Sequence, residues 1–221
     1  MNCVIELIIM DPTKICIVRH GETSWNAEKR IQGQTDIGLD PAGLAQAEAA
    51  AKWLQGTPVA ALYSSDLQRA QQTAAYISVA LGLPTHLLPA MRERRYGLFE
   101  GLTYAEARMQ HSAQYYAFEM REPDFALPEG GESLHQLYER VTGGLCEIVA
   151  RHRGQTVVLV THGGVLDIVN RFVRGNPLDL PRDFLIPNAG INWISYSDGR
   201  WVLESWAETA HLSAVSRDEL P

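Results

Sequence analysis

The sequence KICIVRHGETSWN, residues 14–26, joins a predicted buried strand to a group of polar residues. Four consecutive apolar residues are followed at once by Arg19 and His20. Such continuous apolar runs are typical of strands in parallel sheets that are covered on both faces. A second stretch of the same form, TVVLVTHGG at 156–164, ends in His162 and two glycines. The two stretches therefore predict strands whose carboxyl ends build one site.

Apolar runs alternate with helical patterns along the chain, and this alternation is typical of an α/β fold. Asp40 has the position of a helix N-cap, and Pro41 follows it at the first helical position. Ser65 and Gln68 have the spacing of a capping box at a second helix. We therefore predict a three-layer sandwich with a mostly parallel central sheet flanked by helices. The predicted strands are 14–18, 59–63, 156–161, 191–197 and 200–205, and the predicted long helices are 40–55, 65–81, 133–153 and 163–174.

The chain of 221 residues has the length of one domain. We predict a single domain over residues 1–221, with a mixed insertion of loops and short helices at about 92–132 that covers the active site. The segment 191–205 is predicted to form a hairpin at the sheet edge, and such an edge could join two copies into a homodimer. Residues after Ala207 are predicted to be disordered.

Composition and charge narrow the class of protein. The hydrophobic fraction of 46% and the charged fraction of 20% are typical of a soluble globular protein. The net charge of −7 argues against nucleic acid or an anionic membrane as the main partner, whereas a local group of cations can still bind a small anionic substrate. The three cysteines form no CxxC motif, which predicts a reducing compartment, the cytoplasm. The apolar opening MNCVIELIIM lacks a basic start, so we interpret it as a strand extension or loose tail rather than a signal peptide.

Polar residues follow the predicted strands at the edge where ligands bind in such folds. The guanidinium of Arg19 has forked donors that match phosphate oxygens, and His20 can present one ring nitrogen to a ligand. His162 precedes two glycines that open a helix, where free backbone amides can bind an anion. Arg69 lies about one turn into another helix, near the same edge. Taken singly, each of these residues is also compatible with a surface turn, a helix cap or a solvated side chain.

The segment MRERRYGLFEG adds two carboxylates to these candidates. In a site rich in cations, a carboxyl group beside a bound phosphate dianion can donate a proton. Glu93 or Glu100 could play this part, and an ordinary charged surface loop is the alternative. His20, His162 and Glu22 could suggest a metal site, but the adjacent arginines would repel a divalent cation. We therefore predict no metal.

Taken together, the motifs resemble the histidine phosphatase superfamily, which contains the cofactor-dependent phosphoglycerate mutases and many small-molecule phosphatases. The resemblance runs from Lys14 to about Arg174 and so covers most of the chain. The combination of RHG-E-T, S-D-L-x-R-A-x-x-T-A and a late T-H-G-G is highly specific. The motifs occur in the family's order as VRHGETSWN, RIQGQTDIGLDPAG, LYSSDLQRAQQTA, RERRYGLFEGLT, EGGESL and VTHGG.

The resemblance implies that His20 is the nucleophile that accepts the phosphoryl group and that Glu93 is the general acid and base. It also implies that Arg19, Arg69 and His162 form a cationic pocket around the phosphoryl group. A neutral imidazole between two guanidiniums stays unprotonated near neutral pH, because nearby positive charge disfavours the imidazolium. The implied contacts to phosphate or substrate are Asn26, Gln32, Gly33, Gly163, Tyr96 and Arg94.

The resemblance leaves the phosphoryl acceptor open. Tyr96, in ERRYG, resembles the mutase pattern, but Tyr104 stands near the place where the mutases carry a lysine. The insertion is aromatic and acidic, with Arg121 as its only cation after Arg108, which resembles the phosphatase branch. We therefore predict a metal-independent hydrolase of small phosphorylated metabolites that acts through a phosphohistidine and needs no cofactor.

Two alternatives stay open. A phosphoglycerate mutase would return the phosphoryl group to the substrate, use 2,3-bisphosphoglycerate as primer and hold a second anionic group. Arg94 and Arg95 could bind that group. A phosphate-binding regulatory module on the same fold would show no turnover, although the intact set of catalytic residues argues against it.

Overall fold

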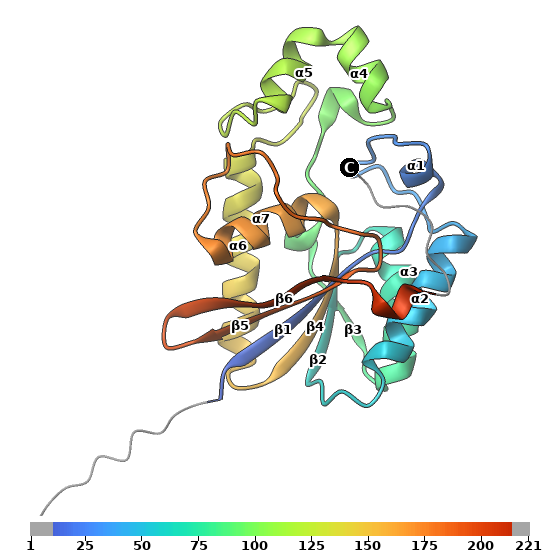
Figure 1. The fold of residues 1–221 in the computed structure, drawn as a ribbon, viewed down its shortest axis with the longest axis vertical. Helices are drawn as coiled ribbons and strands as arrows, with labels where there is room; N and C mark the ends of the chain where they lie inside the picture. Colours follow the sequence, from blue (N-terminus) through green and yellow to red (C-terminus); the bar gives the residue numbers. More distant parts are fainter. Residues whose placement is uncertain (1–10, 214–221) are drawn as a thin grey trace, which may run out of the picture.

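The computed structural model describes residues 11–213, and the described strands form one mixed sheet (Figure 1). The strands are β1 (Thr13–Arg19), β2 (Ala61–Ser64), β3 (Thr85–Leu87), β4 (Thr156–Thr161), β5 (Ile191–Ser197) and β6 (Arg200–Glu208). Their order in the sheet is β3-β2-β4-β1-β5-β6. The first four run parallel, whereas β5 is antiparallel to both β1 and β6. The predicted mostly parallel sheet is thereby confirmed.

Two pairs of long helices cover the two faces of the sheet (Figure 1). The pairs are α2 (Pro41–Leu54) with α3 (Gln68–Leu81), and α6 (Leu134–Arg151) with α7 (Gly163–Arg174). Ile15 and Ile17 of β1 pack into the core on the α6 and α7 side. Cys16 and Val18 pack into the core on the α2 and α3 side. Because β1 is buried on both faces, the three-layer sandwich is confirmed.

The parallel pairing of β1 with β4 brings the two histidine motifs together. Arg19 lies opposite Thr161 in the register, and the His20 amide donates to the Thr161 carbonyl oxygen at 2.9 Å. The chain leaves both strands at the same edge of the sheet. The ring centroids of His20 and His162 consequently lie 5.1 Å apart.

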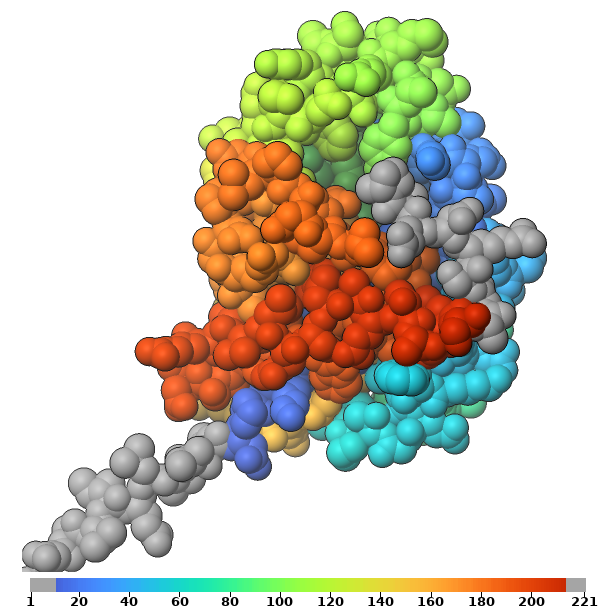
Figure 2. All heavy atoms as spheres, in the orientation of Figure 1, coloured from blue at the N-terminus to red at the C-terminus, as the bar shows by residue number. Residues whose placement is uncertain are grey.

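The predicted insertion at 92–132, here called the cap, has a small apolar core of its own. It contains α4 (Tyr104–Gln110) and α5 (Ser112–Glu119), which lie at the top of the molecule in Figures 1 and 2. Phe99, Ala107 and Leu127 are buried there with Ile31, apart from the two cores on the sheet. The cap is therefore held together by its own apolar contacts. The assignment of the whole chain to a single domain stays a prediction.

The start of α3 differs from the prediction. The helix begins at Gln68 rather than Ser65, and its N-cap Leu67 makes no side-chain hydrogen bond. The Ser65 hydroxyl accepts from the Leu67 amide at 3.3 Å, and it also contacts His162. The predicted capping box is wrong, because the Ser65 hydroxyl contacts His162 instead of capping the helix. The short strand β3 was not predicted, since its sequence THL carries no apolar alternation.

The end of the described chain has regular structure, so the predicted disorder after Ala207 is wrong for residues 208–213. β6 continues to Glu208, a 3-10 helix follows at Ala210–Leu212, and Leu212 is buried. β6 is an edge strand, as the hairpin prediction requires, while the homodimer stays a prediction. The opening MNCVIELIIM lies outside the described residues. Within residues 11–213, no helix is both long enough and apolar enough to cross a bilayer.

The loop that follows His20 is held against α2 by a close backbone approach at two glycines. A Cβ on Gly43 would overlap the Glu22 carbonyl oxygen, and a Cβ on Gly21 would overlap the Gly43 carbonyl oxygen. Asp40, the N-cap of α2, accepts from the Gly43 amide at 2.7 Å. Its own amide donates to the Glu22 carbonyl at 3.1 Å. Only residues without a Cβ permit this approach, which fixes the backbone next to His20.

We expect Gly43→Ala to lower the free energy of unfolding by about 1–3 kcal/mol, because its methyl group overlaps backbone atoms. Gly143→Ala, on the exposed side of α6, is the matched control, since nothing lies within 4 Å of a Cβ there. A helical alanine at that position is expected to raise stability by about 0.5–1 kcal/mol. Urea unfolding of both variants measures the difference, and equal midpoints would contradict the interpretation.

Candidate active site

Within residues 11–213, one ring nitrogen of His20 is fixed by a hydrogen bond and the other has no hydrogen-bond partner. Nδ1 lies 2.7 Å from the Gly21 carbonyl oxygen, which can only accept, so Nδ1 carries the proton. Nε2 therefore keeps its lone pair. Burial lowers the pKa of His20 well below its ordinary value, and the charges of Arg69 and Arg19 lower it further. The imidazole is neutral at pH 7 and can act as a nucleophile.

The guanidiniums of Arg19 and Arg69 are buried and held by backbone carbonyls. Arg19 donates from Nη1 to the Ile186 carbonyl oxygen, while its buried Nε has no partner among the described protein atoms. Burial lowers the pKa of Arg19 to about 10, so the side chain remains charged at neutral pH. Arg69 donates to the carbonyl oxygens of Thr35 and Gly33 at 3.0 and 2.7 Å. Two cations in fixed positions can stabilise a phosphoryl group without reorganisation.

His162 is hydrogen-bonded through both ring nitrogens. Nδ1 accepts from Arg69 Nε at 3.2 Å, so the proton lies on Nε2, which donates to the Ser65 hydroxyl at 2.8 Å. Burial lowers the pKa of His162 well below its ordinary value, and the charge of Arg69 lowers it further. The neutral ring thus orients Arg69 beside His20. Sequence reasoning missed the contact of Ser65, although its place directly after β2 puts it at the same sheet edge.

Two backbone amides hold the carboxylate of Glu93. Oε1 accepts from the Arg94 amide at 2.6 Å, and Oε2 accepts from the Gly164 amide at 3.0 Å. A Cβ on Gly164 would overlap the Glu93 carboxylate, so the contact requires glycine. Glu100, the other candidate acid, accepts from the Tyr96 amide at 2.9 Å and is not among the described residues that line the active-site cavity. The geometry therefore favours Glu93 over Glu100.

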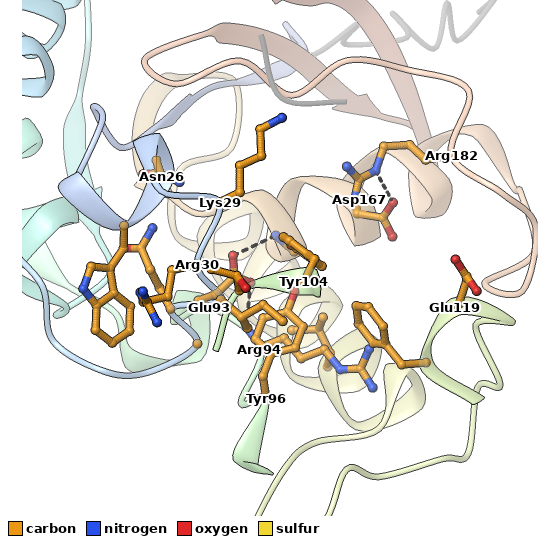
Figure 3. Close-up of a pocket in the computed structure, with 18 of the residues that line it drawn as sticks. Asn26, Lys29, Arg30, Glu93, Arg94, Tyr96, Tyr104, Glu119, Asp167 and Arg182 are labelled. Atoms are coloured by element: carbon orange, nitrogen blue, oxygen red, sulfur yellow. Dashed lines mark hydrogen bonds and ion pairs between the residues drawn. The ribbon is translucent and has the colours of Figure 1, made fainter. Parts of the chain in front are cut away.

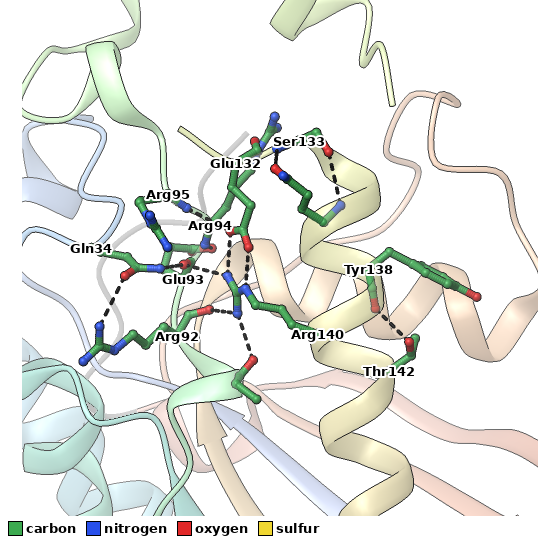
Figure 4. Close-up of polar contacts among 12 residues, drawn as sticks. Gln34, Arg92, Glu93, Arg94, Arg95, Glu132, Ser133, Tyr138, Arg140 and Thr142 are labelled. Carbon is green, nitrogen blue, oxygen red and sulfur yellow. Dashed lines mark hydrogen bonds and ion pairs between the residues drawn. The ribbon is translucent and has the colours of Figure 1, made fainter. Parts of the chain in front are cut away.

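Arg140 in α6 holds the backbone of residues 90–93 by hydrogen bonds (Figure 4). It donates to the carbonyl oxygens of Ala90, Arg92 and Glu93 at 2.8, 2.7 and 2.9 Å. Glu132 accepts two further bonds from Arg140, at 2.6 and 2.8 Å. A guanidinium with so many of its donors engaged makes a rigid support. Sequence reasoning missed it, because Arg140 lies 47 residues from Glu93 and belongs to no motif.

Most of the predicted site residues line a cavity of about 1000 Å³. Figure 3 shows four of them, Asn26, Glu93, Arg94 and Tyr96. Its lining comes from the strand ends, α1 (Ser24–Ala27) and the loop after it, the helices α3, α6 and α7, the cap, and the segment between α7 and β5. Of the described lining residues, seven are arginine or lysine and four are aspartate or glutamate, so the cavity is electropositive although the chain has a net charge of −7. Such local charge concentrates an anionic substrate. The predicted residues in the lining are Arg19, His20, Asn26, Gln32, Gly33, Arg69, Glu93, Arg94 and Tyr96.

The other predicted residues have the following places. His162 and Gly163 lie beside the lining, and a Cβ on Gly163 would be 3.6 Å from Arg19 Nε. Gln32 has a buried Oε1 without a partner among the described protein atoms, which suits an amide that meets a ligand donor. Asn26 is tied through Oδ1 into the capping box at the start of α1.

The structure brings Arg94 to the cavity but not Arg95. Arg94 Nε donates to the Glu132 carbonyl oxygen at 2.8 Å, and its guanidinium carbon lies 5.6 Å from the ring centroid of Tyr96. Arg95 is exposed and lies beside a separate, smaller cavity. The two arginines therefore do not form one anion site.

Comparison with known proteins decides the family. Residues 15–209 match the histidine phosphatase superfamily (branch 1). The chain belongs to this superfamily. The predicted family is thereby confirmed, and with it the predicted phosphoglycerate mutase-like α/β fold. Phosphatases and mutase-like proteins are both among the relatives of this histidine phosphatase.

Three relatives illustrate the range. The metal-independent phosphoserine phosphatase of Arabidopsis thaliana is 40% identical over 206 residues, which cover 92% of this chain and 84% of the relative. Phosphoglycerate mutase-like protein 4 of the same plant is 39% identical over 206 residues, which cover 92% and 88%. The crystal structure of a phosphoserine phosphatase mutant from Entamoeba histolytica in complex with phosphoserine has a TM-score of 0.82 and 30% identity, and the match covers 90% of this chain and 99% of that one.

The buried histidines make the stability of this histidine phosphatase depend on pH. The pKa of His20 and that of His162 are lowered in the folded chain, so below pH 6.5 the unfolded chain binds protons that the folded chain does not. The contribution of these histidines to the free energy of unfolding is therefore complete above this pH. It decreases as the pH falls below 6.5, by up to about 1.4 kcal/mol per pH unit for each histidine.

Between pH 7.5 and 5.5, the free energy of unfolding should decrease in both the wild type and His162→Gln. We expect the decrease to be about 1.4 kcal/mol smaller in His162→Gln, because this variant lacks one of the two buried histidines. Urea unfolding at both pH values measures this. The exposed His86 provides the control variant His86→Gln, which removes an imidazole that folding does not bury. The same pH dependence in all three proteins would show that His162 is not buried in its neutral form.

Proposed function

We propose that this histidine phosphatase hydrolyses small phosphomonoesters without a metal ion, through a phosphohistidine at His20. The observation that carries the proposal is the neutral His20 ring, with Nε2 free, beside the fixed guanidiniums of Arg19 and Arg69 at an electropositive cavity. A nucleophile that is already unprotonated needs no metal ion for its activation. The cysteine usage supports a cytoplasmic location.

The reaction has two steps. In the first, Glu93 starts as the carboxylic acid, His20 Nε2 attacks phosphorus, the ester P–O bond breaks, and Glu93 donates its proton to the leaving oxygen and becomes a carboxylate. In the second, Glu93 accepts a proton from water, the water oxygen attacks phosphorus, and the P–N bond breaks. Inorganic phosphate leaves, and both side chains return to their starting protonation states. Arg19 and Arg69 stabilise the charge on the phosphoryl oxygens in both steps.

Phosphoserine is the substrate that the relatives suggest first. The Arabidopsis relative is named a metal-independent phosphoserine phosphatase, and the Entamoeba phosphatase was solved in complex with phosphoserine. The electropositive lining supports a small substrate with more than one negative group. We therefore extend this substrate class to the present enzyme.

A phosphoglycerate mutase is the second candidate. Tyr96 lines the cavity, as the resemblance to the mutases implies, and one relative is named phosphoglycerate mutase-like protein 4. A mutase would isomerise 3-phosphoglycerate only when primed with 2,3-bisphosphoglycerate. Primer-dependent isomerisation without net phosphate release would replace the phosphatase proposal. Binding of phosphate ligands without any turnover would instead indicate a regulatory module.

We expect the purified enzyme to release phosphate from phosphoserine and from 4-nitrophenyl phosphate, at rates that EDTA does not change. His20→Ala should lose at least about a thousandfold in kcat, because the nucleophile is absent. Acid-labile labelled phosphate should be trapped on the wild type but not on this variant. The exposed His86 again gives the control, and His86→Ala should keep full activity. Full activity in His20→Ala would end the phosphohistidine proposal.

The role of Glu93 can be tested by comparing an ester with a poor leaving group and an ester with a good one. Glu93→Gln keeps the shape of the side chain but has no proton to donate to the leaving oxygen. We expect it to slow phosphoserine hydrolysis by about a hundredfold or more, because a serine alkoxide is a poor leaving group. In the same variant, transfer of the phosphoryl group from 4-nitrophenyl phosphate to His20 should be slowed far less, because 4-nitrophenolate is a good leaving group. Single-turnover kinetics isolate the first step, and equal losses on both esters would assign the acid to another group.

A further inference from the structure

Asp167 in α7 binds three arginines from three parts of the chain. Oδ2 accepts from Arg121 Nη2 at 2.6 Å and from Arg171 Nε at 3.2 Å. Oδ1 accepts from Arg182 Nε at 3.1 Å. Asp167 is only 3% exposed, yet it belongs to the lining of the active-site cavity. Arg121 and Arg182 line the cavity together with Asp167, whereas Arg171 is not among the described lining residues.

Arg182 is the member of this cluster with free donors. Arg171 also donates to the Pro177 carbonyl oxygen, and Arg121 also donates to the Leu178 carbonyl oxygen. Arg182 uses only Nε, and within residues 11–213 its two terminal nitrogens have no hydrogen-bond partner. Its side chain is 39% exposed and lines the cavity.

The place of Arg182 suits a second contact to the substrate. Figure 3 shows Arg182 bonded to Asp167 on one wall of the cavity, apart from Glu93 and Tyr96. Burial is the main cause of the lowered pKa of Arg19, and the positive charge of Arg182 adds to it. Arg19 and Arg182 both line the same cavity, so a ligand that fills it can contact both.

We propose that Arg182, oriented by Asp167, binds a carboxylate of the substrate while Arg19 and Arg69 bind its phosphoryl group. The preferred substrates are then phosphomonoesters of carboxylic acids. This inference rests on the proposed phosphatase function and deepens it. The terminal nitrogens of a guanidinium match the two oxygens of a carboxylate, and the bond through Nε fixes the plane in which they lie.

The experiment compares phosphoserine with phosphoethanolamine, which lacks only the carboxylate. The wild type should prefer phosphoserine by at least about tenfold in kcat/KM, as expected for a hydrogen-bonded charge pair. Arg182→Met should remove most of this preference. Because both substrates carry the same phosphoryl and amino groups, the ratio of their kcat/KM values cancels effects on phosphoryl transfer itself. Phosphoserine carries one more negative charge, so the general effect of losing a cation needs a control variant of its own.

Arg174→Met is the matched control. Arg174 lies on α7, pairs with Asp183 at 3.3 Å, and is not in the described lining of the cavity. Its loss removes the same charge and should leave the ratio unchanged. Arg182→Lys keeps the charge without the fork and should give an intermediate ratio. Asp167→Asn keeps the shape of the orienting group without its charge and should lower the ratio as well.

A wild-type ratio near one, or a ratio that Arg182→Met does not change, would overturn the inference while leaving phosphatase activity intact. Failure to release phosphate from any ester would instead contradict the proposed function. In that case, calorimetric binding of both phosphate esters to the wild type and to Arg182→Met decides the inference. Tighter binding of phosphoserine that is lost in the variant supports it, and equal binding of the two esters overturns it.

Discussion

The backbone ladder between β1 and β4 is the constraint on which the active site depends. Parallel neighbours must end at the same sheet edge, so two distant segments that each place a histidine after a strand are brought side by side. The last bond of the ladder runs from the His20 amide to the Thr161 carbonyl oxygen, directly beside the reacting ring. The distance between His20 and His162 is therefore set by the sheet and not by flexible loops. The close approach of Gly21 and Gly43 then fixes the chain on the far side of His20.

Burial of positive charge has two consequences at this site. Arg19 and Arg69 lose water on folding, and backbone carbonyls only partly replace it, so the free site favours an anion that would complete their hydrogen bonds. Burial lowers the pKa of His20 and that of His162, and the same charges lower both further, so the two rings are neutral. In the proposed mechanism, one arrangement thus binds the phosphoryl group and keeps the nucleophile unprotonated. Its cost to the unliganded fold is offset when a ligand binds.

The sequence predicted correctly those features that depend only on residues close together in the chain, such as helix caps. Asp40 and Ser133 cap their helices as expected, because a cap needs only residues within one turn. Ser65 has the same spacing, but its hydroxyl contacts His162 from a distant strand, and α3 begins later. The family motifs predicted His20 and Glu93 because their roles are tied to short sequences. Arg140 and Arg182 could not be predicted, since each acts through contacts to residues remote in sequence and stands in no motif.

The cap gives one reason why, in the proposed function, the residue that recognises the substrate carboxylate lies apart from the residues that carry out phosphoryl transfer. Phe99, Ala107 and Leu127 are committed to its own small core, and Arg94 is stacked on Tyr96 and tied to a backbone carbonyl. Side chains that hold the cap together are not free to meet a second group on the substrate. Arg182 lies outside the cap, in the irregular segment between α7 and β5, and within residues 11–213 its terminal nitrogens have no hydrogen-bond partner. Changes in that segment can alter the preferred ester without moving the strand ends that carry the phosphoryl chemistry.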